Sequence, residues 1–159
     1  MRSIGADVHK RITVLCVLEE NGEFRRSRVA TTREGLAEVF GELAPGKILM
    51  EASTVSAWVA EVAEKAGLET VVADPNYVAM YGERNRRVKT DDRDAMALAV
   101  ACRTGTYRAV YRPSAAERAV RREVGQRATL VRLRTCAINH VRANLLAEGI
   151  SVAKGDTPR

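Results

Sequence analysis

The chain has 159 residues, 46% of them hydrophobic, which is enough for one domain of ordinary size with a real core. A net charge of +6 favours a polyanionic partner, and three scattered cysteines with only two histidines argue against a disulfide framework or a zinc site. We recognise no signal peptide and no apolar run of about 18 residues, so we expect a cytoplasmic protein without a membrane partner.

The first half of the chain predicts three meander strands followed by alternating helices and strands. Asn21-Gly22 between two strand-like runs is a strong hairpin signal. The expected strands are a short one within residues 3–10 that ends at Asp7, and residues 12–18, 24–31, 47–50 and 69–73; the expected helices are residues 33–43 and 55–66. Because alternating helices and strands give parallel pairs joined by crossovers, we expect an α/β fold with a five-stranded mixed sheet flanked by helices.

Two further helices, a loop and an extended piece are predicted before residue 113. The short helix is expected at residues 77–81, the basic loop at 82–88, the longer helix at about 89–103 and the extended piece at 108–112. The longer helix should turn its small and apolar side chains inward, at Ala95, Leu98, Ala99 and Cys102.

A long C-terminal helix is expected from its N-cap, Ser114, to about Glu148. Its length exceeds that of an ordinary globular helix, and Val124, Val131 and Ile138 recur at heptad spacing. We therefore expect a homo-oligomer joined through this helix. The expected division is a catalytic domain at residues 1–112, a helical extension at 113–149 and a flexible tail at 150–159.

The positive charge is concentrated at the C-terminal end of the chain. Residues 1–111 carry 16 basic and 16 acidic side chains, whereas residues 112–159 carry 10 basic and 4 acidic ones. This distribution predicts that the long helix binds nucleic acid, with help from the basic loop. The candidate nucleic-acid-binding residues are Arg84, Arg86, Arg87, Lys89, Arg127, Arg132 and Arg134.

Four carboxylates stand at positions that a folded sheet could bring together. Asp7 ends the first expected strand, Glu51 ends the fourth, and Asp91 and Asp94 lie three residues apart on one face of a helix start. Sites in mixed α/β sheets gather beyond the strand ends, and Mg²⁺ or Mn²⁺ is held there by hard oxygen ligands. The pattern therefore predicts a metal site for phosphoryl transfer.

Structural roles stay open for most of these carboxylates. Asp91, Asp94 and the intervening Asp92 would also complement a helix dipole, and Glu51 could be an ordinary surface residue. Asp7 is harder to explain in this way, because an ionised carboxylate beside a buried strand is costly unless it is paired or bound to metal. Gly5, two residues earlier, would let a ligand or another backbone approach closely.

Four segments in this order resemble the DEDD transposases of the insertion-sequence one-ten family, to which the Piv DNA invertase is related. They are Ile-Gly-Ala-Asp-Val-His-Lys at 4–10, Leu-Met-Glu-Ala-Ser-Thr at 49–54, Val-Val-Ala-Asp-Pro at 71–75 and Lys-Thr-Asp-Asp-Arg-Asp-Ala at 89–95. The resemblance extends over about residues 3–148. It implies a RuvC-like domain of the ribonuclease H fold, with Asp7, Glu51, Asp91 and Asp94 as the catalytic acidic tetrad and Asp92 outside it.

The resemblance also implies a function. Members of the family are transposases or site-specific recombinases that cleave and transfer DNA strands with divalent metal, guided by a structured RNA. Full-length members carry a second, C-terminal domain with a serine important for strand cleavage. This chain stops at Arg159, and the surroundings of Ser151 do not match the serine motif, so we expect a fragment that is incomplete on its own.

Three other functions fit part of the pattern. A truncated, non-catalytic module that binds nucleic acid would share the charge but bind no metal. A RuvC-like junction resolvase would use the same fold and carboxylates. An actin-like ATPase also begins with a strand meander ending in Asp, but it needs glycine-rich loops around the phosphates, and Asp7 is followed by Val-His-Lys.

Overall fold

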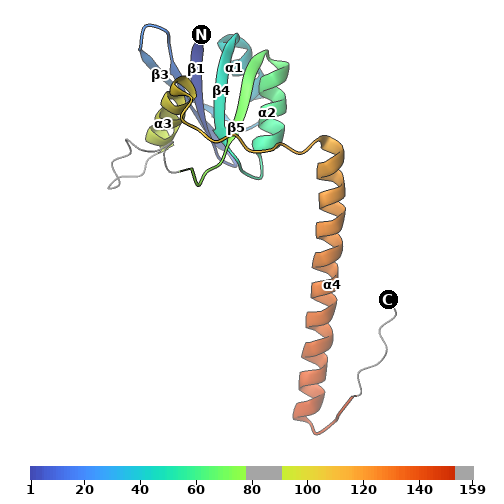
Figure 1. The fold of residues 1–159 in the computed structure, drawn as a ribbon. Coiled ribbons are helices and arrows are strands. Elements are labelled where there is room, and N and C mark those ends of the chain that lie inside the picture. Colours follow the sequence, from blue (N-terminus) through green and yellow to red (C-terminus); the bar gives the residue numbers. More distant parts are fainter. Residues whose placement is uncertain (78–90, 153–159) are drawn as a thin grey trace. The chain divides into compact units, whose positions relative to one another are not determined.

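The N-terminal part of the chain is built on a five-stranded mixed sheet with the strand order β3-β2-β1-β4-β5 (Figure 1). The strands are β1 (Arg2–Val8), β2 (Ile12–Leu18), β3 (Phe24–Ala30), β4 (Gly46–Glu51) and β5 (Leu68–Ala73). β1, β2 and β3 pair antiparallel, whereas β4 is parallel to both β1 and β5. A meander followed by parallel crossovers confirms the predicted α/β fold with a five-stranded mixed sheet.

The computed structural model describes residues 1–77 and 91–152, and for Asp91 it describes only the backbone. It divides into two compact units, Met1–Arg112 and Pro113–Arg159, which we call the sheet unit and the helical unit. Several predictions lie outside the described residues: the helix at 77–81 beyond its first residue, the loop at 82–88, most of the tail, and the candidates Arg84, Arg86, Arg87 and Lys89.

The turn between β2 and β3 forms as its sequence predicts. Gly22 adopts a φ of +89°, which a residue with a Cβ rarely adopts. The side-chain Oδ1 of Asn21 accepts a hydrogen bond of 3.0 Å from the backbone N–H of Glu23, and the Glu19 N–H donates to the Glu23 carbonyl at 2.9 Å. The turn therefore fixes the register of β2 against β3.

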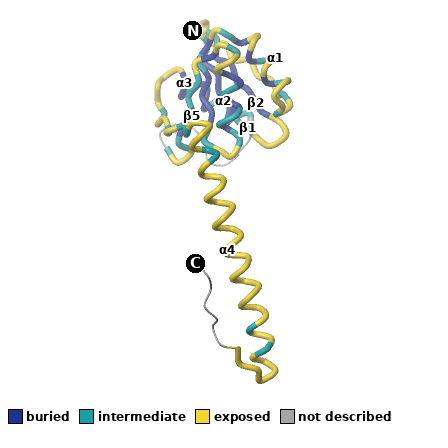
Figure 2. The backbone as a smooth tube through the Cα atoms, turned by 90° about the vertical axis from the view of Figure 1, so that its right-hand side faces the viewer, coloured by how far each residue is buried: buried dark blue, intermediate teal, exposed yellow. Residues whose placement is uncertain are grey.

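Helices cover both faces of the sheet. α1 (Arg33–Leu43) and α2 (Ser56–Lys65) pack on one face around Ile4, Phe40 and Met50. α3 (Asp91–Thr104) packs on the other face, where the residues expected to face inward, Ala95, Leu98, Ala99 and Cys102, are all buried. Figure 2 shows the buried residues concentrated in the strands and the inner sides of the helices.

The predicted extended piece closes the sheet unit at its β5 edge. The Val110 N–H donates to the Val72 carbonyl at 2.9 Å, and the Asp74 N–H donates to the Arg108 carbonyl at 2.8 Å. Arg112 forms a two-pronged ion pair with Glu64 of α2, and this guanidinium lowers the pKa of the Glu64 carboxyl. This ion pair therefore holds the last residue of the sheet unit against α2.

The helical unit consists of α4 (Ala115–Ala147) and the few residues after it. Ser114 and Glu117 form a capping box, in which the Ser114 Oγ accepts from the Glu117 N–H at 3.2 Å and the Ser114 N–H donates to Glu117 at 2.8 Å. No residue of α4 is buried. Within residues 1–77 and 91–152, no helix has both the length and the apolar character needed to cross a membrane.

Candidate metal and active site

Asp7 and Glu51 finish neighbouring parallel strands. The register pairs Gly5 with Leu49 and Ala6 with Met50, and Asp7 and Glu51 are the next residues along β1 and β4. Side chains alternate along a strand, and directly opposite residues of parallel strands share a face. Asp7 therefore lies on the face that carries Gly5, and Glu51 on the face that carries Leu49, which is the same face of the sheet. Both are partly buried.

That face of β1 is covered by α3 at unusually close range, because Gly5 has no side chain. A Cβ built on Gly5 would lie 2.0 Å from the Ala95 carbonyl oxygen and 2.4 Å from the Ala99 nitrogen. Both atoms belong to the α3 backbone, so no change of rotamer could relieve the overlap. The close approach expected at Gly5 is therefore made by a helix.

The direction of α3 follows from its other contacts. Near its C-terminal end, the Cys102 Sγ lies 3.5 Å from the carbonyl of Lys47 at the start of β4, and Arg103 donates to the Leu18 carbonyl at 2.8 Å. Leu18 pairs with Ser3, at the start of β1. α3 therefore runs antiparallel to β1 and begins where β1 and β4 end. We call this end of the sheet, with Asp7, Glu51 and the first turn of α3, the acidic edge.

Asp94 lies in this first turn, directly before Ala95, and it is only 8% exposed. It interacts with its surroundings, but its Oδ1 atom is buried and accepts no hydrogen bond from another described residue. An ionised carboxylate at this depth requires compensation by a cation or by hydrogen bonds. Asp91 begins the same turn, one residue ahead of Asp92.

The acidic edge contains one contact that the sequence did not predict. The Nε2 atom of His9 lies 3.1 Å from the Oδ2 atom of Asp7. His9 is about half exposed, whereas the Asp7 side chain is 15% exposed. His9 is the first residue after β1, and its spacing of two residues from Asp7 was the only sign in the sequence that they could meet.

Asp92 contacts the edge strand β3. Its Oδ1 atom accepts a hydrogen bond of 3.1 Å from the Nη2 atom of Arg28 on β3, and the pair is largely exposed. Asp92 thus has a partner on the edge strand. Among the side chains that the structure describes, which exclude that of Asp91, no three of His, Cys, Asp and Glu lie close enough together to hold a metal ion.

The chain directly after Glu51 is held in place by two serines. The Ser53 N–H donates to the Ser56 Oγ at 3.1 Å, and the Ser56 N–H donates to the Ser53 Oγ at 3.2 Å. This reciprocal pair closes the turn that leads from β4 into α2. Glu51 is therefore held from both sides, by β4 before it and by this turn after it.

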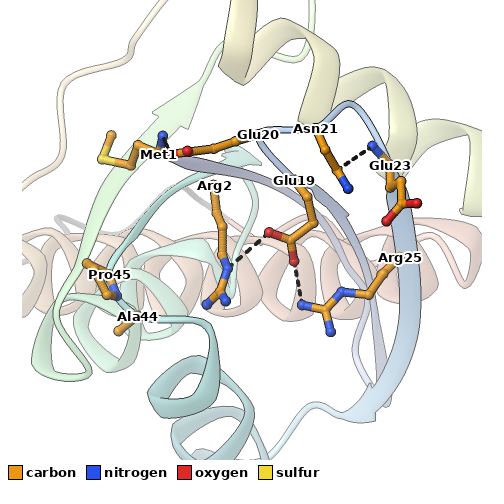
Figure 3. Close-up of a pocket in the computed structure, with 9 residues that line it drawn as sticks. All are labelled: Met1, Arg2, Glu19, Glu20, Asn21, Glu23, Arg25, Ala44 and Pro45. Carbon is orange, nitrogen blue, oxygen red and sulfur yellow. Dashed lines mark hydrogen bonds and ion pairs between the residues drawn. The ribbon is translucent and has the colours of Figure 1, made fainter.

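A pocket of about 1030 Å³ lies at the opposite end of the sheet (Figure 3). Its charges pair with one another: Glu19 accepts from the Nε of Arg2 at 3.2 Å and from Arg25 at 2.5 Å. The hydrogen bond from Arg25 is the main cause that lowers the pKa of the Glu19 carboxyl. Because these groups satisfy one another, we assign no binding role to this pocket.

Comparisons with known proteins identify related transposases. Residues 4–148 match the transposase family of the DEDD, IS110 type. The chain is 27% identical over 155 residues to the transposase for insertion sequence element IS1111A of Coxiella burnetii, a match over 98% of this chain and 42% of that transposase. The chain thus spans about two-fifths of the length of this curated relative.

Two solved structures are also similar to this chain, both with 16% sequence identity over 69% of this chain and 100% of theirs. They are Thermus thermophilus RuvC, with a TM-score of 0.47, and the same protein in complex with a Holliday junction substrate, with a TM-score of 0.41.

Proposed function

Because this chain belongs to the IS110 family of DEDD transposases, we propose that its sheet unit is the metal-dependent, DNA-cleaving domain of a transposase. One observation carries this proposal: the α3 backbone lies directly against Gly5, so that the helix begins where β1 and β4 end. This packing supports the convergence of Asp7 and Glu51 with the first turn of α3. DNA as the substrate and a structured guide RNA as a partner are parts of the same proposal, supported by the family.

The residues at the acidic edge fit a divalent cation. Asp7, Glu51, Asp91 and Asp94 offer only hard carboxylate oxygens, which suit Mg²⁺ or Mn²⁺. Two carboxylate charges about 4 Å apart repel each other by roughly 1 kcal/mol in water and about 4 kcal/mol at an effective dielectric of 20. The burial of Asp94 increases the free-energy cost of this repulsion. A bound ion would offset it and would polarise a scissile phosphate.

The other residues of the edge hold these carboxylates in position. His9 contacts the carboxylate of Asp7, and the hydrogen bonds between Ser53 and Ser56 hold the turn after Glu51. Asp92 is engaged by Arg28 and is not proposed as a ligand. Because the chain spans only 42% of the length of its curated relative, we expect at most weak, metal-dependent nicking from it and no joined DNA product.

A thermal-shift titration with Mg²⁺ or Mn²⁺ tests the metal site. An ion that binds only the folded state raises the melting temperature as its concentration increases. Asp7→Asn should remove most of this increase. Asp92→Asn is the matched control: it makes the same chemical change three residues from Ala95 and disturbs only a surface ion pair of about 0–1 kcal/mol. It should keep most of the increase.

Two results would contradict the proposal. If neither ion changes the melting temperature of the wild type, the chain is better described as a nucleic-acid-binding module without catalysis. If Asp7→Asn responds to the ions as the wild type does, the cation is bound somewhere other than the acidic edge.

We further propose that α4 joins two or more copies of the chain. Its apolar side chains at heptad spacing are well exposed: Val124 is 63%, Val131 40% and Ile138 40% accessible. A helix of 33 residues without buried side chains gains little stability from propensity alone and normally requires packing. The heptad spacing supports packing against the same stripe of another copy.

A further inference from the structure

A second pocket, of about 390 Å³, lies at the turn between β1 and β2. We call it the basic pocket; it is lined by His9, Lys10, Arg11, Ile12, Val14 and Arg28. Three of its six lining side chains carry permanent positive charge, and no carboxylate lines it. Val14 is buried and gives the pocket an apolar floor.

The basic pocket adjoins the acidic edge on two sides. His9, at one wall, lies 3.1 Å from the Oδ2 atom of Asp7. Arg28, at the other wall, donates at 3.1 Å to Asp92 in the first turn of α3. A group bound in the pocket would therefore lie beside the carboxylates proposed to hold metal.

The backbone of the turn is fixed by hydrogen bonds that leave the cationic side chains outside. The His9 N–H donates to the Ile12 carbonyl at 3.3 Å, and the Arg11 carbonyl accepts from the Thr31 N–H at 2.9 Å. Lys10 and Arg11 are both exposed at the tip of this held turn. Their stems start from fixed positions, which lowers the entropy lost when they close on a ligand.

We propose that the basic pocket binds a backbone phosphate of the DNA strand that is cleaved at the acidic edge. This inference rests on the proposed function. A cluster of carboxylates repels a polyanion, so a strand lying there requires cations close by. Lys10 and Arg11 supply them, whereas Arg28 is shared with Asp92. Contacts to phosphate fix the register of a strand without reading its sequence. Arginine is well suited to this task, because its planar fork matches a phosphate group.

The test compares two double variants of the chain in DNA-binding titrations over a range of salt. Lys10→Ala with Arg11→Ala removes two positive charges from the basic pocket. The control variant, Arg25→Ala with Lys65→Ala, also removes two positive charges. They lie at the opposite end of the sheet, near Pro45 and the end of α2. The probe is a short DNA duplex of mixed sequence, with an RNA duplex of the same sequence alongside. Melting temperatures of both variants, measured without divalent ion, establish that they are folded.

We expect the pocket variant to lower the slope of log affinity against log salt by about 0.7–0.9, the loss of one neutralised phosphate. The ratio of the wild-type affinity for DNA to the affinity of this variant should then fall about threefold between 50 and 200 mM salt. The control variant should keep the slope of the wild type. The lower slope of the pocket variant and the unchanged slope of the control variant should both be seen with the DNA duplex.

Each contrary outcome has a distinct meaning. If the pocket variant and the control variant bind DNA alike, the inference is wrong while the proposed function stands. If only RNA binding loses slope, the pocket binds RNA and the assignment to DNA is wrong. If the wild type binds no DNA even at low salt, the proposed function fails, and the inference fails with it.

Discussion

Replacing Gly5 by alanine should separate the two halves of the acidic edge. The new Cβ would meet the Ala95 carbonyl oxygen at 2.0 Å and the Ala99 nitrogen at 2.4 Å. Ordinary contacts of this kind are longer than about 3.4 Å, so α3 must retreat from β1 by roughly 1–1.4 Å. Since the obstructing atoms are backbone, the helix must move as a whole and carry its first turn away from Asp7 and Glu51.

The expected consequences differ for stability and for metal binding. Overpacking of this kind typically costs about 1–3 kcal/mol, occasionally more, of the free energy of unfolding. Metal binding should suffer more, because ligand distances in a working site lie within about 0.2 Å of their ideal values. A shift of roughly 1 Å in Asp91 and Asp94 is several times that tolerance. The melting temperature of Gly5→Ala should therefore fall, and its increase with Mg²⁺ should be lost.

The assay is thermal unfolding with and without Mg²⁺, after circular dichroism has established that the variant is folded. Gly41→Ala in α1 is the matched control, because a Cβ at Gly41 has no neighbour within 4 Å. That change should be neutral or should stabilise the helix by about 0.5–1 kcal/mol. If Gly5→Ala melts like the wild type and still responds to Mg²⁺, α3 does not depend on this contact, and the argument for the site is refuted.

Four further predictions concern the cysteines and the helical unit. Burial raises the pKa of the Cys102 thiol to about 11, so in the folded protein near pH 8 iodoacetamide should label the exposed Cys136 and not Cys102, as read by mass spectrometry. The protonated thiol contributes its full stability below its unfolded pKa of about 9, and this contribution is lost as the pH rises through 11. The free energy of unfolding should therefore fall by about 2–3 kcal/mol over that range. In Cys102→Ala the fall should be smaller. Replacing three arginines together by alanine should lower the salt slope of DNA binding by about 2–3, since each neutralised phosphate contributes about 0.7–0.9; they are Arg127, Arg132 and Arg134. Glutamate at both Val131 and Ile138 should convert an α4-mediated oligomer to monomer in light scattering, and a wild type that is already monomeric at high concentration would contradict the proposed oligomer.

Local signals predicted the elements of the fold well, because each rests on a few neighbouring residues. Asn21-Gly22 gives the β2–β3 turn, Thr32 caps α1, and Ser114 with Glu117 caps α4. The bounds of α1 and β2 agree with the prediction residue for residue, whereas the ends of β4 and β5 differ by one residue. The residue at which a strand ends depends on its last hydrogen bond to the neighbouring strand. That pairing cannot be deduced from a single sequence.

The candidate site could be predicted only in part. The position of Asp7 and Glu51 at strand ends follows from the apolar runs before them. The choice between Asp91, Asp92 and Asp94 required a resemblance to a family, because consecutive residues on a helix start all have similar local patterns. The structure supplies a physical difference: Asp94 is buried beside Ala95, while Asp92 reaches Arg28 across the sheet.

Arg28 illustrates why the basic pocket escaped sequence reasoning. β3 is the edge strand of the sheet, and nearly all of its residues are exposed although its ends looked apolar. Charged side chains on such a strand usually serve to prevent edge-to-edge pairing, and this role alone would explain why they are there. Only the register of β3 beside β2, Val14 opposite Arg28, brings this charge to the turn that carries Lys10 and Arg11. The same residue can therefore protect an edge and complete a phosphate site, and the two roles make different demands: edge protection accepts any charge at position 28, whereas phosphate binding requires a positive one.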